Sequence, residues 1–337
     1  MIVYNVGGAS QLKWCFDHFS VGKEQATYFT TTGAIVMSIE QLNIDFGIAG
    51  QLEVVAGAGG FPFIKINHPQ AQALISVYSG QVLAFRPQHT PQDLMFLSDK
   101  AYYQVGKAIK GGVPICWPWF GPDPQGLGRS AHGFVRNRLW NLKASQVTTS
   151  GEIQVSLGLT DTEETRALWP QAFALDIVVT VGQKLTIELT TLNTDNETFT
   201  ITQALHTYFQ VGDIGQTQVL GLEDTAYIDK VEQGVNKVQK GPVLIHAEVD
   251  RIYTHVAKPL VIVDSQLQRR IVITSQGSHT AVVWNPGPAI CAQMADLEDD
   301  AYQNFICVET ANAGEELVTL KPGEVARLLA VYSVEQD

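Results

Sequence analysis

The chain lacks the signatures of several large protein classes. Its four cysteines (Cys15, Cys116, Cys291 and Cys307) are scattered without Cys-x-x-Cys spacing, which argues against a zinc site or a disulfide framework. No run of about 18 apolar residues occurs, so no membrane-spanning helix is predicted. The N-terminus lacks the basic region, apolar run and small-residue cleavage site of a secretory signal. We therefore expect a reduced, cytoplasmic protein without a metal site or a membrane partner.

The common nucleotide-binding and hydrolase motifs are also missing. The sequence contains no Gly-x-Gly-x-x-Gly, no Gly-x-x-x-x-Gly-Lys-[Ser/Thr] and no Gly-x-Ser-x-Gly. No repeat with a period of 20–50 residues is visible, which argues against a propeller. We expect neither a bound nucleotide nor any other cofactor.

Positive charge is scarce overall but concentrated in one segment. Lys and Arg number 22 against 34 Asp and Glu, for a net charge of −12, which disfavours nucleic acid as a partner. Between residues 107 and 143, however, a single acidic residue, Asp123, faces an excess of basic ones. These are Lys107, Lys110, Arg129, Arg136, Arg138 and Lys143. Because such side chains bind phosphate through charge-assisted hydrogen bonds, the segment predicts a site for a small anion. The alternative is a loop with ordinary solvated charges.

The same region, residues 106–140, is rich in glycine, proline and tryptophan and shows neither helical nor strand periodicity. Such a loop is too long and too apolar to be a mere connector, and ordered loops of this length usually build binding sites. Trp117, Trp119 and Trp140 could stack on a sugar ring, although packing in the core is the other role open to them.

Strand patterns dominate after about residue 52. Residues 73–78 and 81–86 form one predicted hairpin, and residues 173–181 and 184–192 form another. Helical signal is confined to short pieces such as 161–168. Many closely spaced strands in a chain of 337 residues predict an all-β fold, a large β-sandwich with few short helices.

The domain organisation follows from the weak patterning of the N-terminal part. We interpret residues 1–42 as an extension of unknown role and residues 43–337 as a single β-sandwich domain. Ser38 is a suitable N-cap for a short amphipathic helix, so residues 1–36 are expected to be dispensable for the fold.

Two residues stand out as a possible acid/base pair. His206 lies on the predicted strand 198–211, on the face with Ala204 and Tyr208, where a histidine could donate a proton near neutral pH. Glu309 is expected to end a strand that is apolar on both faces, where desolvation would raise its pKa and suit it to general-base work. The alternatives are a structural histidine and a solvated glutamate. Asp250, next to Arg251 on another strand, is a possible acceptor for sugar hydroxyls or simply a surface residue.

Five motifs in fixed order give the chain a resemblance to a known family. They are GKAIKGGVPICWPWFGP, AHGFVRNRLW, ALHTYFQV, EVDRIY and FICVETAN. In this order they resemble the glucose-6-phosphate 1-epimerases, hexose-6-phosphate mutarotases related to aldose 1-epimerase. The match covers about residues 51–334. It departs from the family pattern at Lys110, where arginine is more common, and at Ala131, where some relatives carry glutamine.

The resemblance implies a galactose-mutarotase-like β-supersandwich and the interconversion of α and β anomers of glucose 6-phosphate or a similar hexose 6-phosphate. It implies that His206 is the general acid and Glu309 the general base, without a cofactor. The substrate-binding set expected on the same basis is Lys110, Arg136, Asp250, His132 and Arg86. We expect a monomer or weak oligomer. The alternatives are an aldose 1-epimerase for unphosphorylated sugars and a non-catalytic sugar-phosphate-binding protein on the same fold.

Overall fold

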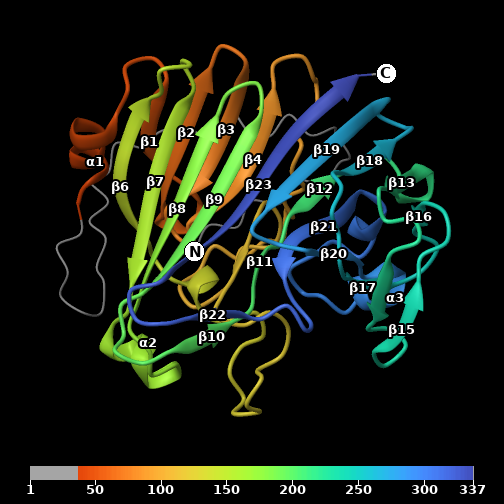
Figure 1. Ribbon diagram of the computed structural model, residues 1–337. Coiled ribbons are helices and arrows are strands. Elements are labelled where there is room, and N and C mark those ends of the chain that lie inside the picture. Colours follow the sequence, from red (N-terminus) through yellow and green to blue (C-terminus); the bar gives the residue numbers. More distant parts are fainter. Residues whose placement is uncertain (1–36, 337) are drawn as a thin grey trace.

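The computed structural model describes residues 37–336 as three antiparallel β-sheets with a few short helices (Figure 1). A nine-stranded sheet spans the molecule, and a four-stranded and an eight-stranded sheet cover its two halves. Side chains from all three sheets, such as Ile64, Ile177 and Val283, belong to one continuous core. The all-β prediction and the galactose-mutarotase-like fold are confirmed.

Within each sheet, neighbouring strands pair in the following order. The four-stranded sheet contains β1 (Leu52–Ala56), β2 (Pro62–His68), β3 (Ala71–Ser76) and β4 (Gln81–Pro87). The eight-stranded sheet contains β15 (Val235–Val238), β14 (Ala226–Asp229), β17 (Val249–Tyr253), β20 (Thr280–Asn285), β21 (Phe305–Asn312), β11 (Gln203–Leu205) and β5 (Ile115–Cys116), with β12 (Tyr208–Gln210) also paired to β21. The nine-stranded sheet contains β16 (Val243–Leu244), β13 (Thr217–Leu220), β18 (Leu260–Asp264), β19 (Arg269–Gln276), β23 (Val325–Gln336), β9 (Leu185–Asn193), β8 (Phe173–Val181), β7 (Ile153–Thr160) and β6 (Asn141–Val147).

The remaining elements are short. A two-stranded ribbon pairs β10 (Phe199–Ile201) with β22 (Val318–Leu320). The helices are α1 (Ile39–Phe46), α2 (Glu163–Leu168) and α3 (Gly287–Cys291), and the 3-10 turns are η1 (Ala58–Gly60), η2 (Val135–Asn137), η3 (Ile214–Gln216) and η4 (Ala301–Gln303).

Both predicted hairpins are present because their sequences alternate as a half-buried sheet requires. Every second residue of β8 and of β9 is buried, and the two strands pair in register from Phe173 with Asn193 to Val181 with Leu185. Each fully buried aliphatic side chain of this kind stabilises the fold by roughly 1.5–3 kcal/mol. The hairpin β3–β4 also matches its prediction, with a bulge between Leu74 and Ile75.

The predicted strand 198–211 is divided into three short ones, β10, β11 and β12. The backbone of this stretch changes partners as it passes the segment 112–118. Thr202 N donates to Pro118 O at 3.1 Å, His206 N to Pro114 O at 2.9 Å and Tyr208 N to Gly112 O at 2.9 Å. The alternation of apolar and polar residues predicts which side chains are buried, but not which strand lies alongside. The change of partners could therefore not be predicted from it.

Glu309 lies inside its strand, whereas we expected it at the end. β21 continues past it to Asn312, and all eight of its residues are buried. The strand lies between β20 and β11, so its prediction as a central strand is confirmed. Residues 310–312 continue the strand because they form ladder pairs with β11 and β20.

The predicted helix near Ser38 is α1, and the Ser38 hydroxyl accepts from Gln41 N at 3.1 Å. The Asn43 side chain joins this helix to β1, since it both donates to and accepts from the Val54 backbone. Residues 37–42 therefore contribute to a packed element. The rest of the predicted extension, residues 1–36, lies outside the described residues.

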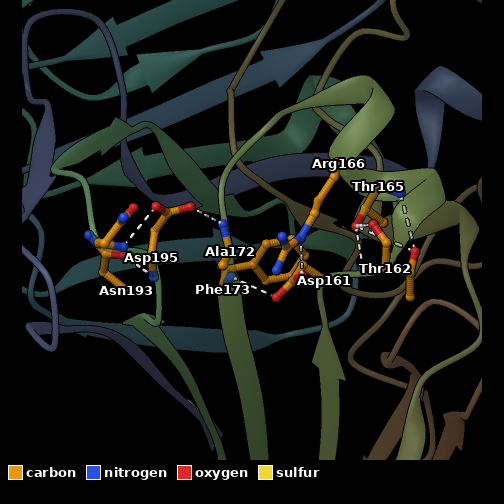
Figure 2. A network of polar contacts seen from close by, with 9 residues as sticks. Asp161, Thr162, Thr165, Arg166, Ala172, Phe173, Asn193 and Asp195 are labelled. Atoms are coloured by element: carbon orange, nitrogen blue, oxygen red, sulfur yellow. Dashed lines mark hydrogen bonds and ion pairs between the residues drawn. The ribbon is translucent and has the colours of Figure 1, made fainter.

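A polar network fixes the turn around α2 (Figure 2). Thr162 and Thr165 form a reciprocal capping box at the start of the helix. Asp161 accepts from Phe173 N at 3.1 Å and also from the Arg166 side chain. These bonds hold the start of β8, where the Phe173 ring packs 4.4 Å from the ring of Trp117. Through the contact between Phe173 and Trp117, the network helps to position the loop segment 106–140.

Two glycine motifs allow that segment to lie close to the sheets. Gly111 and Gly112 have positive φ, and a Cβ would overlap Phe96 O in the first case and Val82 O of β4 in the second. Gly133 has φ 73°, and a Cβ there would overlap the carbonyl of Trp117. Because only glycine tolerates both the conformation and the contact, these positions fix the path of the loop.

We predict that Gly133→Ala lowers the free energy of unfolding by roughly 3–5 kcal/mol, since it adds steric overlap to backbone strain. Gly126→Ala is the matched control: Gly126 has φ 66°, but nothing lies within 4 Å of the place that a Cβ would occupy, so only about 1–2 kcal/mol should be lost. Urea unfolding of both variants provides the measurement. Equal losses would show that the contact with Trp117 is unimportant.

Candidate active site

His206 lies in the short connection between β11 and β12, in a cage of aromatic rings. Its ring stacks on Tyr208 with centroids 5.0 Å apart, and the edges of His132 and Trp284 approach at 5.4 and 5.9 Å. Its backbone is fixed by the bond to Pro114 described above. Only 7% of the residue is exposed, so the ring is held in one orientation and reaches little solvent.

Glu309 faces His206 from the neighbouring strand. One carboxylate oxygen lies 3.4 Å from His206 Nε2, and Glu309 is 2% exposed. Neither carboxylate oxygen, nor His206 Nδ1, has a hydrogen-bond partner within residues 37–336. Buried polar atoms are normally satisfied, so two facing residues with orphaned atoms indicate a place where a polar ligand binds. The alternative of a solvated glutamate is excluded.

Burial shifts both pKa values toward the neutral forms. Desolvation raises the pKa of Glu309 well above its usual range, and the negative charge of Asp250 adds to the shift. Desolvation lowers the pKa of His206 well below its usual value, helped by His132 and by the cations Arg136 and Lys110. Groups this close titrate as a unit. In the absence of ligand, burial favours the neutral carboxyl group and the neutral imidazole.

A basic cavity of about 240 Å³ adjoins this pair. Its lining residues are Tyr102, Lys107, Ala108, Ile109, Lys110, Pro114, Arg136, Tyr208 and Asp296. Lys110 Nζ lies 3.4 Å from a carboxylate oxygen of Asp296, and the Arg136 guanidinium donates to Ala131 O. Tyr208 belongs to both places, because it lines the cavity and stacks on His206. Tyr208 thus connects the His206–Glu309 pair with the cationic cavity.

Only half of the basic excess noted in the sequence lines this cavity. Arg129 pairs with Asp123 and covers the Trp119 ring at 4.2 Å. Arg138 pairs with Glu164, and Lys143 pairs with Asp176. These three have structural partners, so they were misleading as evidence for an anion site.

Asp250 and His132 lie near the pair. Asp250 is on β17 directly opposite Trp284 of β20, and burial raises its pKa to about 6. Burial lowers the pKa of His132 to about 3, and its Nδ1 accepts from Gly121 N at 3.3 Å. The neutral ring therefore carries its proton on Nε2, where it can donate a hydrogen bond.

Arg86 is the one expected binding residue that the structure places elsewhere. It lies on β4, donates to the side chain of Gln72 on β3, and its charge acts on buried Asp93. It does not line the cavity that contains Lys110 and Arg136. A basic residue at the end of a predicted strand could not be distinguished from a ligand-binding one by sequence.

Three residues of the site escaped sequence reasoning: Tyr208, Trp284 and Asp296. Tyr208 was visible two positions after His206 in the LHTYF motif, where the next side chain on the same strand face is expected. Trp284 and Asp296 gave no such signal. The tryptophans we considered as sugar platforms, Trp117, Trp119 and Trp140, are at most 4% exposed and belong to the core.

Comparisons with known proteins identify the family of the chain. The family model described as aldose 1-epimerase matches residues 62–333. The chain belongs to the aldose 1-epimerase family. Among curated members, a protein of Escherichia coli provisionally named a glucose-6-phosphate 1-epimerase is 38% identical over 80% of this chain and 90% of its own length. A protein of Cenchrus ciliaris with the same provisional name is 36% identical over 75% of this chain and 78% of its own length.

Solved structures extend the likeness of this epimerase-family chain to the fold. A Salmonella typhimurium protein provisionally described as a mutarotase has a TM-score of 0.80 and 33% identity, over 87% of this chain and 96% of its own. A galactose mutarotase-like protein from Clostridium acetobutylicum shares the fold at 14% identity, with a TM-score of 0.67 over 85% of this chain and 98% of its own. Of the helices in residues 37–336, none has the length and apolar character to cross a membrane.

We predict that Glu309→Gln changes the pH dependence of stability. Because the folded-state pKa is raised, the contribution of Glu309 is fully present below its unfolded value of 4.5 and is lost as pH rises through the folded value. The free energy of unfolding of the variant should therefore rise relative to that of the wild type as the pH is raised from 4.5 to 8. Urea unfolding at several pH values measures this.

The matched control is Glu315→Gln, which alters an exposed glutamate in the turn after β21. Its stability difference from the wild type should stay flat across the same pH range. A flat difference for Glu309→Gln as well would mean that the carboxyl group titrates normally in the folded protein.

Proposed function

We propose that this protein interconverts the α and β anomers of D-glucose 6-phosphate, or of a similar hexose 6-phosphate. The observation that carries the proposal is the link that Tyr208 makes between the His206–Glu309 pair and the cationic cavity, because Tyr208 stacks on His206 and lines the cavity. The provisional names of the Escherichia coli and Cenchrus ciliaris relatives support the same substrate.

The reaction needs two proton movements. Glu309 as carboxylate takes the proton of the C1 hydroxyl while protonated His206 gives a proton to the ring oxygen, and the C1–O5 bond breaks. The open-chain aldehyde then rotates about the C1–C2 bond. Closure on the other face returns one proton from the C5 hydroxyl to His206 and one from Glu309 to the carbonyl oxygen. Each group contributes roughly 10²–10⁴-fold as a positioned acid or base.

Sharing one proton suits this chemistry. Before ring opening the pair is ionised, and after it both groups are neutral, so the enzyme passes a proton from His206 to Glu309 through the substrate. Burial favours the neutral pair in the empty site. Sugar hydroxyls that donate to the orphaned carboxylate oxygens stabilise the ionised form. The two forms of the pair are thereby brought closer in free energy, as a reversible reaction requires.

The phosphoryl group fits the cavity by charge. Arg136 and Lys110 line it, and the phosphate of a sugar carries about −1.5 to −2 charge at pH 7. Asp250 and His132 lie around the acid/base pair, where they supply an acceptor and a donor for sugar hydroxyls, and Trp284 offers a half-buried ring face.

One observation favours a second candidate, an epimerase for unphosphorylated aldoses. Lys110 is already paired with Asp296, which reduces the positive charge available to an anion. The two functions share the acid/base chemistry and differ only in the cavity, so variants of the cavity separate them.

We predict that His206→Ala and Glu309→Gln each reduce catalysed exchange between the anomers of glucose 6-phosphate by at least roughly 10²-fold, because each removes one proton-transfer group. NMR exchange spectroscopy, with protein-free solution to set the spontaneous rate, measures this. Glu315→Gln should exchange at the wild-type rate. Near-normal turnover in either site variant would reject the assignment of acid and base.

We also predict that Lys110→Met and Arg136→Met raise the KM for glucose 6-phosphate roughly ten-fold or more, because each removes a charge-assisted contact with the phosphoryl group. Exchange of unphosphorylated glucose serves as the control and should change little. Equal effects on both sugars would assign the cavity to another role and favour the aldose epimerase.

A further inference from the structure

We propose that Lys107 is a specificity-determining residue that supplies a third cation to the phosphoryl group. The proposal rests on the function proposed above. Lys107 is not among the substrate-binding residues that the resemblance implies. Lys107 lines the same cavity as Lys110 and Arg136, three positions before Lys110 in the chain.

Two of the basic residues, Arg136 and Lys107, have no carboxylate partner among the described residues, and Arg136 donates to Ala131 O instead. Arg129, Arg138 and Lys143 each have a carboxylate partner outside the cavity. Lys110 has one within it, Asp296. Among the described residues, no carboxylate lies within ion-pair distance of Lys107 Nζ, which instead lies 5.8 Å from the centre of the Tyr102 ring. A lysine kept beside a cavity without a counter-ion is available to an anionic ligand.

The charge balance of the cavity requires such a residue. Lys110 and Arg136 contribute two positive charges and Asp296 removes one, which leaves one net positive charge to face a phosphate of about −1.5 to −2. With Lys107 the net charge rises to two. The cavity then matches a phosphate dianion.

The backbone at Lys107 is anchored although its side chain is exposed. The hydroxyl of Tyr78, a residue that is 1% exposed, donates to Lys107 O at 2.7 Å and to Gln104 O at 3.1 Å. The core therefore determines where the loop passes. The Tyr102 ring, also in the cavity wall, keeps the ammonium group nearby through a cation–π contact.

Lys107 also compensates for the lysine that this chain carries at position 110, where arginine is more common in the family. An arginine there would hold a phosphate with two parallel hydrogen bonds, whereas a lysine offers a single point charge. A second lysine three positions earlier, on the same cavity wall, supplies the second donor that Lys110 alone lacks.

The test is Lys107→Met, with Lys184→Met as the matched control. Lys184 is an exposed lysine in the β8–β9 turn, so its loss changes the net charge of the protein equally without touching the cavity. Lys107→Met should raise the KM for glucose 6-phosphate about five-fold, as expected for a partly solvated charge contact, with kcat and glucose exchange unchanged. The effect should shrink below about pH 6, where the phosphate loses its second charge. Lys184→Met should match the wild type.

Binding of inorganic phosphate, followed by ³¹P NMR, provides a readout that does not depend on turnover. If wild-type protein binds phosphate and Lys107→Met binds it several-fold more weakly, the role of Lys107 stands even if no anomer exchange is catalysed, and the proposed function alone fails. If wild-type protein catalyses exchange and Lys107→Met matches it in KM and phosphate affinity, the role of Lys107 is rejected and the function stands. Wild-type protein that neither binds phosphate nor accelerates exchange rejects both.

Discussion

The pairing of the segment 112–118 with the chain that carries His206 is the interaction on which the site depends. Three backbone bonds, accepted by Gly112, Pro114 and Pro118, lay this otherwise irregular segment along β11 and β12. One end of the segment carries Lys110 into the cavity, and the other end is Trp117 and Pro118, packed into the core. Without this register the cations and the acid/base pair would belong to separate surfaces. The glycines at 111 and 112 are required on the other side of the segment, where the backbone passes too close to Phe96 and Val82 for a side chain.

The site places two ionisable groups, His206 and Glu309, where they are almost inaccessible to water. Their burial lowers the stability of the folded protein. A buried carboxyl group and imidazole with orphaned atoms are unfavourable in an empty protein. β21 tolerates Glu309 because the strand is paired on both sides and its neighbours pack tightly. The loss of stability is confined to the site, and packing in the continuous core shared by the three large sheets offsets it.

Sequence reasoning reached the fold and most of the site, for identifiable reasons. Alternating strands such as β8 and β9 report burial directly, and short motifs locate His206 and Glu309. What it could not reach depends on contacts between distant parts of the chain. The division of residues 198–211 into three strands, the position of Glu309 inside β21 and the contribution of Asp296 all come from neighbours that no local pattern reveals. Arg86 looked like Arg136 in sequence and differs only in what surrounds it.

The proposed acid/base pair and the proposed phosphate-binding residues come from different kinds of structure. Glu309 lies on β21 and His206 in the short connection between β11 and β12, whereas Lys107, Lys110 and Arg136 all come from one loop segment, residues 106–140. If these roles are as proposed, changes in that loop would alter which sugars are accepted while the positions of His206 and Glu309 are preserved. Such a division would make the scaffold readily evolvable, because new substrate preferences could arise by substitution or exchange of a single stretch of chain.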